Sequence, residues 1–153
     1  MTTDAVVALL FAAFALYGAY ADIRSRTIPN SFNALMAITG LGATWLTAGS
    51  SAAALGLAHV AVALGAGMLI YGLRMWGGGD AKFYAASAAW FSLWDFPRLA
   101  VSIALAGLVL LIVWFGVRQI RRSPKLDKKG KELPYGVAIA IGGTGTLALG
   151  LLN

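Results

Sequence analysis

The fold of this chain is decided by residues 52–82, AAALGLAHVAVALGAGMLIYGLRMWGGGDAK, in which a long apolar run ends in three glycines, an aspartate and a lysine. An apolar run of about 20 residues matches the ~30 Å hydrocarbon layer of a membrane. A carboxylate at the end of such a run is unfavourable to bury and indicates a functional site by default. Asp80 is therefore a candidate site residue, and Gly77 and Gly79 are expected to shape its surroundings.

The whole chain has the composition of a membrane protein, because 59% of its 153 residues are hydrophobic and only 12% are charged. A soluble domain of this composition would expose large apolar patches to water. The apolar runs predict an all-α, polytopic membrane protein that forms one domain over residues 1–153 and has six transmembrane helices. These helices are expected at residues 5–21, 31–48, 52–74, 81–94, 98–117 and from 134 to the C-terminus.

The fourth and the first of these helices have features that predict how they sit in the membrane. The fourth helix spans only ~20 Å at 1.5 Å per residue, so it is expected to begin below the membrane surface, after irregular glycine-rich backbone that lines a cavity. The first apolar run has no basic region before it, so we interpret it as a retained span and not as a signal peptide.

The basic residues predict the orientation in the membrane. All of them except Arg98 lie in the loops after the first, third and fifth expected helices. The positive-inside rule places these loops in the cytoplasm and both termini outside, so that Asp22 and Asp80 lie at the cytoplasmic face. The net charge of +6 is explained by this topology and by attraction to anionic lipid, and a nucleic-acid partner is not expected.

Several kinds of site are excluded by residue counts. The chain has no cysteine and a single histidine, His59. Disulfides, cysteine nucleophiles and the paired-histidine metalloprotease motif are therefore impossible. His59 lies within the third expected helix and is expected to serve packing. No metal and no organic cofactor is expected, and the carboxylates remain for acid and base chemistry.

Asp22 and Asp80 together have the chemistry of an aspartyl hydrolase. Two nearby carboxyl groups share one proton, so that the ionised group activates water while the protonated group polarises the scissile carbonyl. Asp22 lies at the C-terminal end of the first expected helix, and Asp80 lies at the N-terminal end of the fourth. The helix dipoles therefore predict that Asp80 is the ionised base and Asp22 the protonated acid.

Four sequence elements resemble those of the prepilin peptidases, which are membrane aspartyl proteases of the G-x-G-D type. They are D-x-R-x-R-x-I-P-N at residues 22–30, G-G-G-D at residues 77–80, the lysine of G-G-G-D-x-K at Lys82, and P-Y-G at residues 134–136. Longer members of the family carry an additional N-methyltransferase region with cysteine pairs. Because this chain lacks cysteine, it resembles the short, peptidase-only forms found with Flp/Tad-type pili and archaeal preflagellins.

The resemblance implies an activity and a partner. It implies removal of the short basic leader peptide from a type IV prepilin-like precursor, at the cytoplasmic face of the inner membrane, with Asp22 and Asp80 as catalytic residues. The apolar helix of the precursor is expected to lie among the helices of the enzyme. Lys82 is either a residue near the two aspartates or a positively charged anchor at the membrane surface. The oligomeric state is not indicated by the sequence.

Two alternatives from other classes stay open. A small proton or cation transporter would use Asp22 and Asp80 to bind the ion, but it needs polar residues toward the opposite face, which the first, third and fifth helices hardly offer. A scaffold subunit of a secretion system would leave the two aspartates and the glycine run without a purpose.

Overall fold

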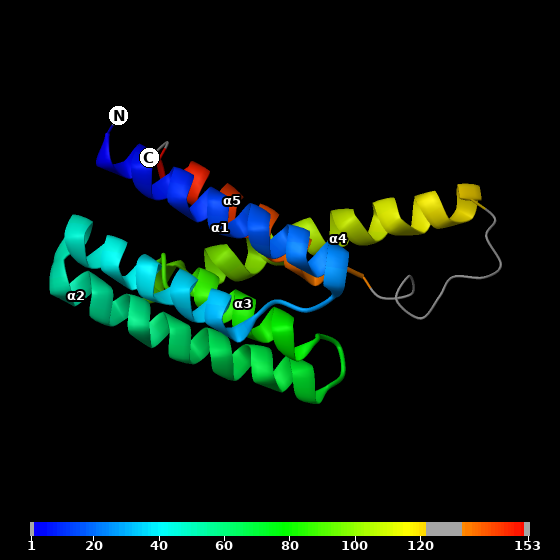
Figure 1. Ribbon diagram of the computed structural model, residues 1–153, viewed down its shortest axis with the longest axis horizontal. Helices are drawn as coiled ribbons and strands as arrows, with labels where there is room; N and C mark the ends of the chain where they lie inside the picture. The colour runs from blue at the N-terminus through cyan, green and yellow to red at the C-terminus, as the bar shows by residue number, and fades with distance from the viewer. Residues whose placement is uncertain (1, 122–132, 152–153) are drawn as a thin grey trace.

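A computed structural model describes residues 2–121 and 133–151 of the chain as a bundle of helices (Figure 1). The elements are α1 (Thr3–Ser25), α2 (Asn30–Gly72), α3 (Gly78–Ala88), the short 3-10 helix η1 (Leu93–Asp95), α4 (Phe96–Arg121) and α5 (Tyr135–Leu151). The described residues form no strand, which confirms the all-α fold class. Most of the expected basic loop before the last helix, residues 122–132, lies outside the described residues.

The long helix α2 consists of two antiparallel arms, residues 30–48 and 50–72. Gly49 interrupts it with non-helical angles, φ 83° and ψ 179°, which favour glycine. Figure 1 shows the chain turning back at this point, and a Cβ atom on Gly56 of the second arm would lie 3.3 Å from Leu41 of the first. The uncharged turn predicted at residues 49–51 is therefore present.

Three helices are long and apolar enough to cross a membrane by length and composition: Thr3–Ser25, Asn30–Gly72 and Leu93–Gln119. The segment Tyr135–Gly150 is apolar but shorter. These helices indicate an integral membrane protein. The six separate spans expected from the sequence are not confirmed by this count.

The short helix after the glycine run is displaced from its predicted position. It was expected over residues 81–94, whereas α3 covers Gly78–Ala88 and is followed by a turn and η1. The shift has a local cause, because the Oδ2 atom of Asp80 accepts a hydrogen bond of 3.1 Å from the amide of Gly77 and closes the first turn. Asp80 is therefore part of the first turn of α3 instead of preceding the helix.

Large aromatic side chains of the core lie against glycines of neighbouring helices. Phe83 of α3 lies on Gly18 of α1, and Trp90, just after α3, lies on Gly40 of α2, where an added Cβ atom would be 2.6 Å from its ring. The Trp90 indole also donates a hydrogen bond of 3.2 Å to the carbonyl of Met36. In membrane proteins, small residues such as glycine let neighbouring helices approach closely in this manner. The two contacts place α3 inside the bundle.

The crossing of α4 and α5 gives a stability prediction. A Cβ atom on Gly142 of α5 would lie 2.6 Å from the backbone nitrogen and Cα atom of Ile103, whereas one on Gly145 would meet nothing within 4 Å. Gly142→Ala is therefore expected to lower the free energy of unfolding by about 1–3 kcal/mol, as overpacking usually does. Thermal unfolding of the purified protein in detergent measures this, with Gly145→Ala as the matched control. Equal stability of the two variants would contradict the close contact.

Candidate active site

Asp22 lies in the last turn of α1 and is buried, with 6% of its surface exposed. Its Oδ2 atom accepts a hydrogen bond of 2.8 Å from the amide of Gly136, in the first turn of α5. The helix was expected to end before Asp22, but it continues to Ser25, and Arg26 closes it in a left-handed conformation with φ 55°. The extra turn therefore fixes the position of the carboxylate against another helix.

The hydrogen bond from Gly136 bears on which aspartate holds the shared proton. The amides at a helix N-terminus stabilise negative charge. Asp22 is at the C-terminal end of its own helix, but its carboxylate lies at the N-terminal end of α5. Asp80 lies in the first turn of α3 and accepts the Gly77 amide. Both carboxylates therefore accept an amide hydrogen bond at a helix N-terminus, and the assignment of the shared proton to Asp22 stays a prediction.

The glycines before Asp80 provide space. Gly49 is the only glycine of the described residues with a positive φ angle, so the run at residues 77–79 is not needed for a left-handed turn. A Cβ atom on Gly77 would lie 3.1 Å from Oδ2 of Asp80, closer than most real contacts of this kind. A Cβ atom on Gly79 would lie 3.7 Å from the backbone nitrogen of Ile28, which precedes Pro29 in the loop between α1 and α2. The glycine run thus lies directly beside that loop.

Lys82 connects the same two segments. Its Nζ atom donates a hydrogen bond of 2.9 Å to the side-chain oxygen of Asn30, the first residue of α2. Asn30 is the last residue of the element that begins at Asp22. The bond therefore joins the segment that carries Asp22 to the helix that carries Asp80.

A second link runs through two aromatic rings. The ring centroids of Trp76 and Tyr135 are 5.8 Å apart, in a tilted arrangement. Trp76 precedes Gly77, whose amide binds Asp80, and Tyr135 precedes Gly136, whose amide binds Asp22. The ring contact therefore joins the two residues that directly precede the amide donors of Asp80 and Asp22.

These contacts bring all four sequence elements to one end of the bundle. In Figure 1 the C-terminal end of α1 and the N-terminal ends of α3 and α5 lie at this same end. The predicted site residues Asp22, Asp80, Gly77, Gly79 and Lys82 all belong to this group. Sequence reasoning did not include Trp76, Tyr135 or Gly136 among the site residues. The signal for the last two was available, because the P-Y-G element was recognised without a role.

Two carboxylates held at one end of a helical bundle form a candidate acid/base pair. The model of the type IV leader peptidase family matches residues 9–118, a range that includes Asp22, Asp80 and Lys82. The chain belongs to this family.

A curated relative of the family is similar over most of this chain. It is a prepilin leader peptidase/N-methyltransferase from Pectobacterium carotovorum subsp. carotovorum, 29% identical over 147 aligned residues, which cover 89% of this chain. The alignment covers 48% of the relative, so the chain spans about half the length of that protein. No solved structure shows significant similarity to the chain.

The Lys82 bond gives a prediction that separates the two interpretations of this lysine. If Lys82 positions the two segments, Lys82→Met and Asn30→Ala each remove the same hydrogen bond. Such a bond contributes about 1 kcal/mol, so each variant is expected to cleave roughly fivefold more slowly. The double variant is then expected to be no worse than either single variant. Rates of precursor cleavage for the four proteins test this. If the fold-changes of the two single variants multiply in the double variant, the two side chains act independently, and this would favour Lys82 as an anchor at the membrane surface.

Proposed function

We propose that this protein is an aspartic endopeptidase that removes the short basic leader peptide from type IV prepilin-like precursors. The observation that carries the proposal is the buried Asp22 carboxylate, held by the start of α5 at the same end of the bundle as Asp80. Membership of the type IV leader peptidase family and the printed name of the bacterial relative support the substrate class.

Asp22 and Asp80 are the proposed catalytic residues. One carboxylate accepts a proton from the attacking water while the other carboxyl group donates its proton to the scissile carbonyl oxygen, which gives a gem-diol. As the C–N bond breaks, the first carboxyl group passes the proton taken from water to the leaving nitrogen, and the second carboxylate recovers a proton from the gem-diol. The amides of Gly136 and Gly77 hold the two side chains in place for these transfers. Gly77 and Gly79 keep the surroundings of Asp80 open, and Lys82 positions the adjoining segments.

We further propose that the site faces the cytoplasm and that the chain crosses the inner membrane six times, with both termini outside. The two arms of α2 support two of these crossings, because 19 and 23 residues at 1.5 Å each correspond to about 29 and 35 Å, close to the ~30 Å hydrocarbon layer. The basic residues Arg24, Arg26, Arg74 and Lys82 belong to the end of the bundle that carries the two aspartates, as expected for a cytoplasmic side.

The direct test is mass spectrometry of a type IV prepilin-like precursor in membrane vesicles, with and without the purified wild-type chain. The proposal predicts a mass loss equal to the basic leader only when the chain is present. An intact precursor over a panel of such substrates would overturn it. A proton or cation flux in proteoliposomes that contain only this chain would then support the transporter alternative.

A further inference from the structure

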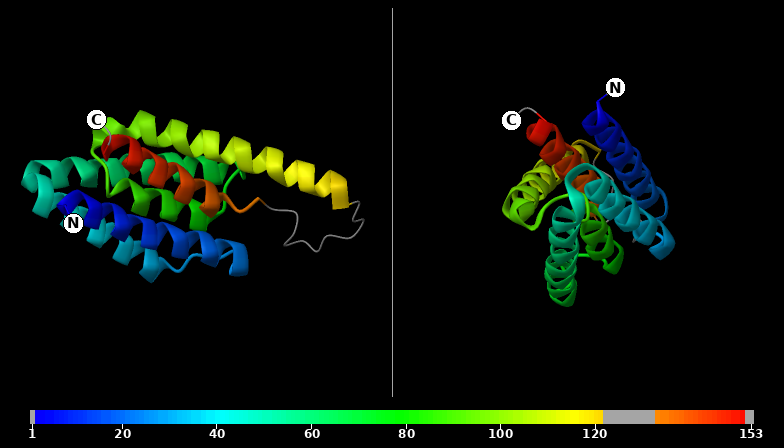
Figure 2. Two further views of the ribbon diagram at one scale, coloured as in Figure 1. Left: turned by 90° about the horizontal axis from the view of Figure 1, so that it is seen from above. Right: turned by 90° about the vertical axis from the view of Figure 1, so that its left-hand side faces the viewer.

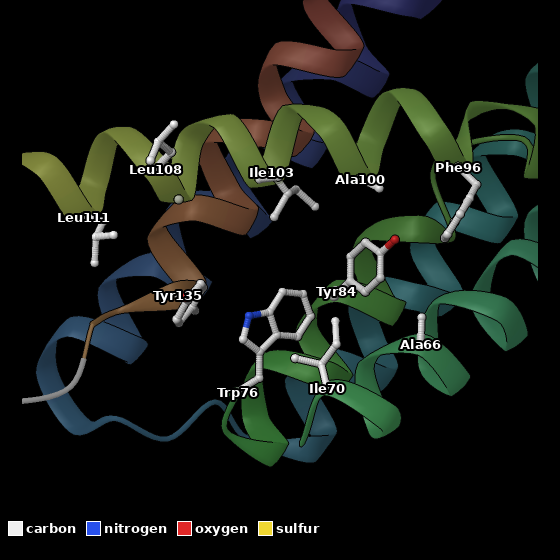
Figure 3. Close-up of a pocket in the computed structure, with 12 residues that line it drawn as sticks. Ala66, Ile70, Trp76, Tyr84, Phe96, Ala100, Ile103, Leu108, Leu111 and Tyr135 are labelled. Atoms are coloured by element: carbon white, nitrogen blue, oxygen red, sulfur yellow. The ribbon is translucent and has the colours of Figure 1, made fainter. Parts of the chain in front are cut away.

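A groove with a volume of about 430 Å³ lies between α4 on one side and α2, α3 and α5 on the other. Figure 3 shows side chains from these helices pointing into the space between them. On α4, the lining residues Ala100, Ala104, Leu108 and Leu111 follow each other at intervals of three or four positions, so they form one face of the helix. This face extends over about 17 Å, more than half of the ~30 Å hydrocarbon layer.

One end of the groove is lined by residues next to the candidate active site. Trp76 and Tyr135 line this end, and each directly precedes a glycine whose amide binds one of the aspartates. Tyr84 lies in the groove with its hydroxyl turned away from Trp76 (Figure 3), and it is one helical turn, about 6 Å, beyond Asp80 along α3. The opposite end is lined by Phe96, at the start of α4. The groove therefore runs from residues that adjoin the candidate active site along the chain into the apolar part of the bundle.

We propose that this groove holds the apolar transmembrane helix of the substrate, with the bond to be cut beside Trp76 and Tyr135. The proposal rests on the proposed peptidase function and adds the surface that recognises the substrate. A peptide that enters the hydrocarbon layer must satisfy its own backbone hydrogen bonds, so the occupant is a helix there. It unwinds only where it reaches the polar end with the aspartates.

The shape of the groove suits a helix. Ala100 and Ala104 are one turn apart on α4 and face Ala66 of α2 across the groove, and such small side chains let a second helix approach closely. Leu108 is 53% exposed, so the groove is reachable from its side. A lipid chain also fits an apolar groove, but it brings no peptide bond to Asp22 and Asp80.

Disulfide crosslinking tests the occupant, since the chain has no cysteine of its own. The Asp80→Asn variant is used as the background so that the precursor stays intact. Ala104→Cys lies in the groove, and Ala106→Cys lies on the same helix but lines a different depression, formed with α5. Each variant is mixed in membrane vesicles with a precursor that carries one cysteine in its apolar helix, two turns after the leader. The vesicles are oxidised and analysed by non-reducing electrophoresis.

The expected result is a crosslinked band with Ala104→Cys and none with Ala106→Cys. A band with Ala106→Cys, equal bands, or no band with either would overturn the groove assignment. Cleavage of the same precursor by the wild-type chain is measured in parallel. Cleavage without a crosslink at Ala104→Cys means that lipid or nothing occupies the groove although the peptidase function is correct. No cleavage by the wild type overturns the proposed function itself.

Filling the groove gives a second readout. Ala104→Trp is expected to raise the KM for the full precursor at least severalfold and to leave cleavage of a short peptide without the apolar helix unchanged. Ala106→Trp is the matched control and is expected to change neither. If Ala104→Trp loses activity toward both substrates, the groove does not act only by binding the apolar helix of the precursor, and the proposal is contradicted.

Discussion

Asp80→Asn is expected to lower the rate of leader removal by about 10²–10⁴-fold, the usual contribution of a positioned acid or base. Asparagine keeps the size of the side chain and can still accept the Gly77 amide with its oxygen, so the first turn of α3 is retained. It can neither take a proton from water nor share one with Asp22. The rate is measured by quantitative mass spectrometry of the precursor and the shortened product.

The control for this variant is Asp4→Asn. Asp4 is an exposed residue in the first turn of α1, at the end of the helix opposite to Asp22. The same chemical change there is expected to leave cleavage unchanged. A rate for Asp80→Asn within a factor of about two of the wild type would show that Asp80 has no part in the proton transfers.

Gly136→Ala is expected to lower the cleavage rate by about 10²-fold, because displacements near 1 Å have this effect on catalysis. A Cβ atom on Gly136 would lie 2.8 Å from the Cβ atom and 2.9 Å from Oδ2 of Asp22. Non-bonded carbon atoms clash at such distances, so either the carboxylate or the start of α5 must move. Both movements break the hydrogen bond of 2.8 Å that holds Asp22.

Gly145→Ala on the same helix separates this local effect from a general loss of helix packing. Nothing lies within 4 Å of the Cβ position at Gly145, so this variant is expected to retain the wild-type rate. Cleavage at the wild-type rate by Gly136→Ala would mean that the contact between α5 and Asp22 is not needed for activity. Thermal unfolding of both variants shows whether the loss of rate exceeds the loss of folded protein.

The local features of the fold could be predicted from the sequence. The turn at Gly49 and the presence of a short helix at the glycine run follow from glycine chemistry and from the length of the apolar runs. The shared end of Asp22 and Asp80 follows from the alternation of the helices. Helix ends were less accurate, because side-chain contacts decide them: the first turn of α3 forms when Asp80 accepts the Gly77 amide.

The partner of Asp22 could not be predicted. Gly136 is 114 residues away in the chain, and a bond over this separation depends on how α1 and α5 pack. The predicted position of the shared proton considered only the dipole of the helix to which each aspartate belongs, and it stays a prediction. Trp76 lines the groove and contacts Tyr135, a pairing over 59 residues of sequence that likewise depends on how the helices pack.

The central claim is that the packing of α1, α3 and α5 makes one catalytic unit of two carboxylates that are distant in sequence. The most direct measurement is the cleavage rate of Asp22→Asn beside that of Asp80→Asn, on the same precursor and at equal amounts of inserted protein. The account predicts that both rates fall to a similar level, about 10²–10⁴-fold below the wild type. Near wild-type cleavage by Asp22→Asn, with activity lost in Asp80→Asn, would contradict it.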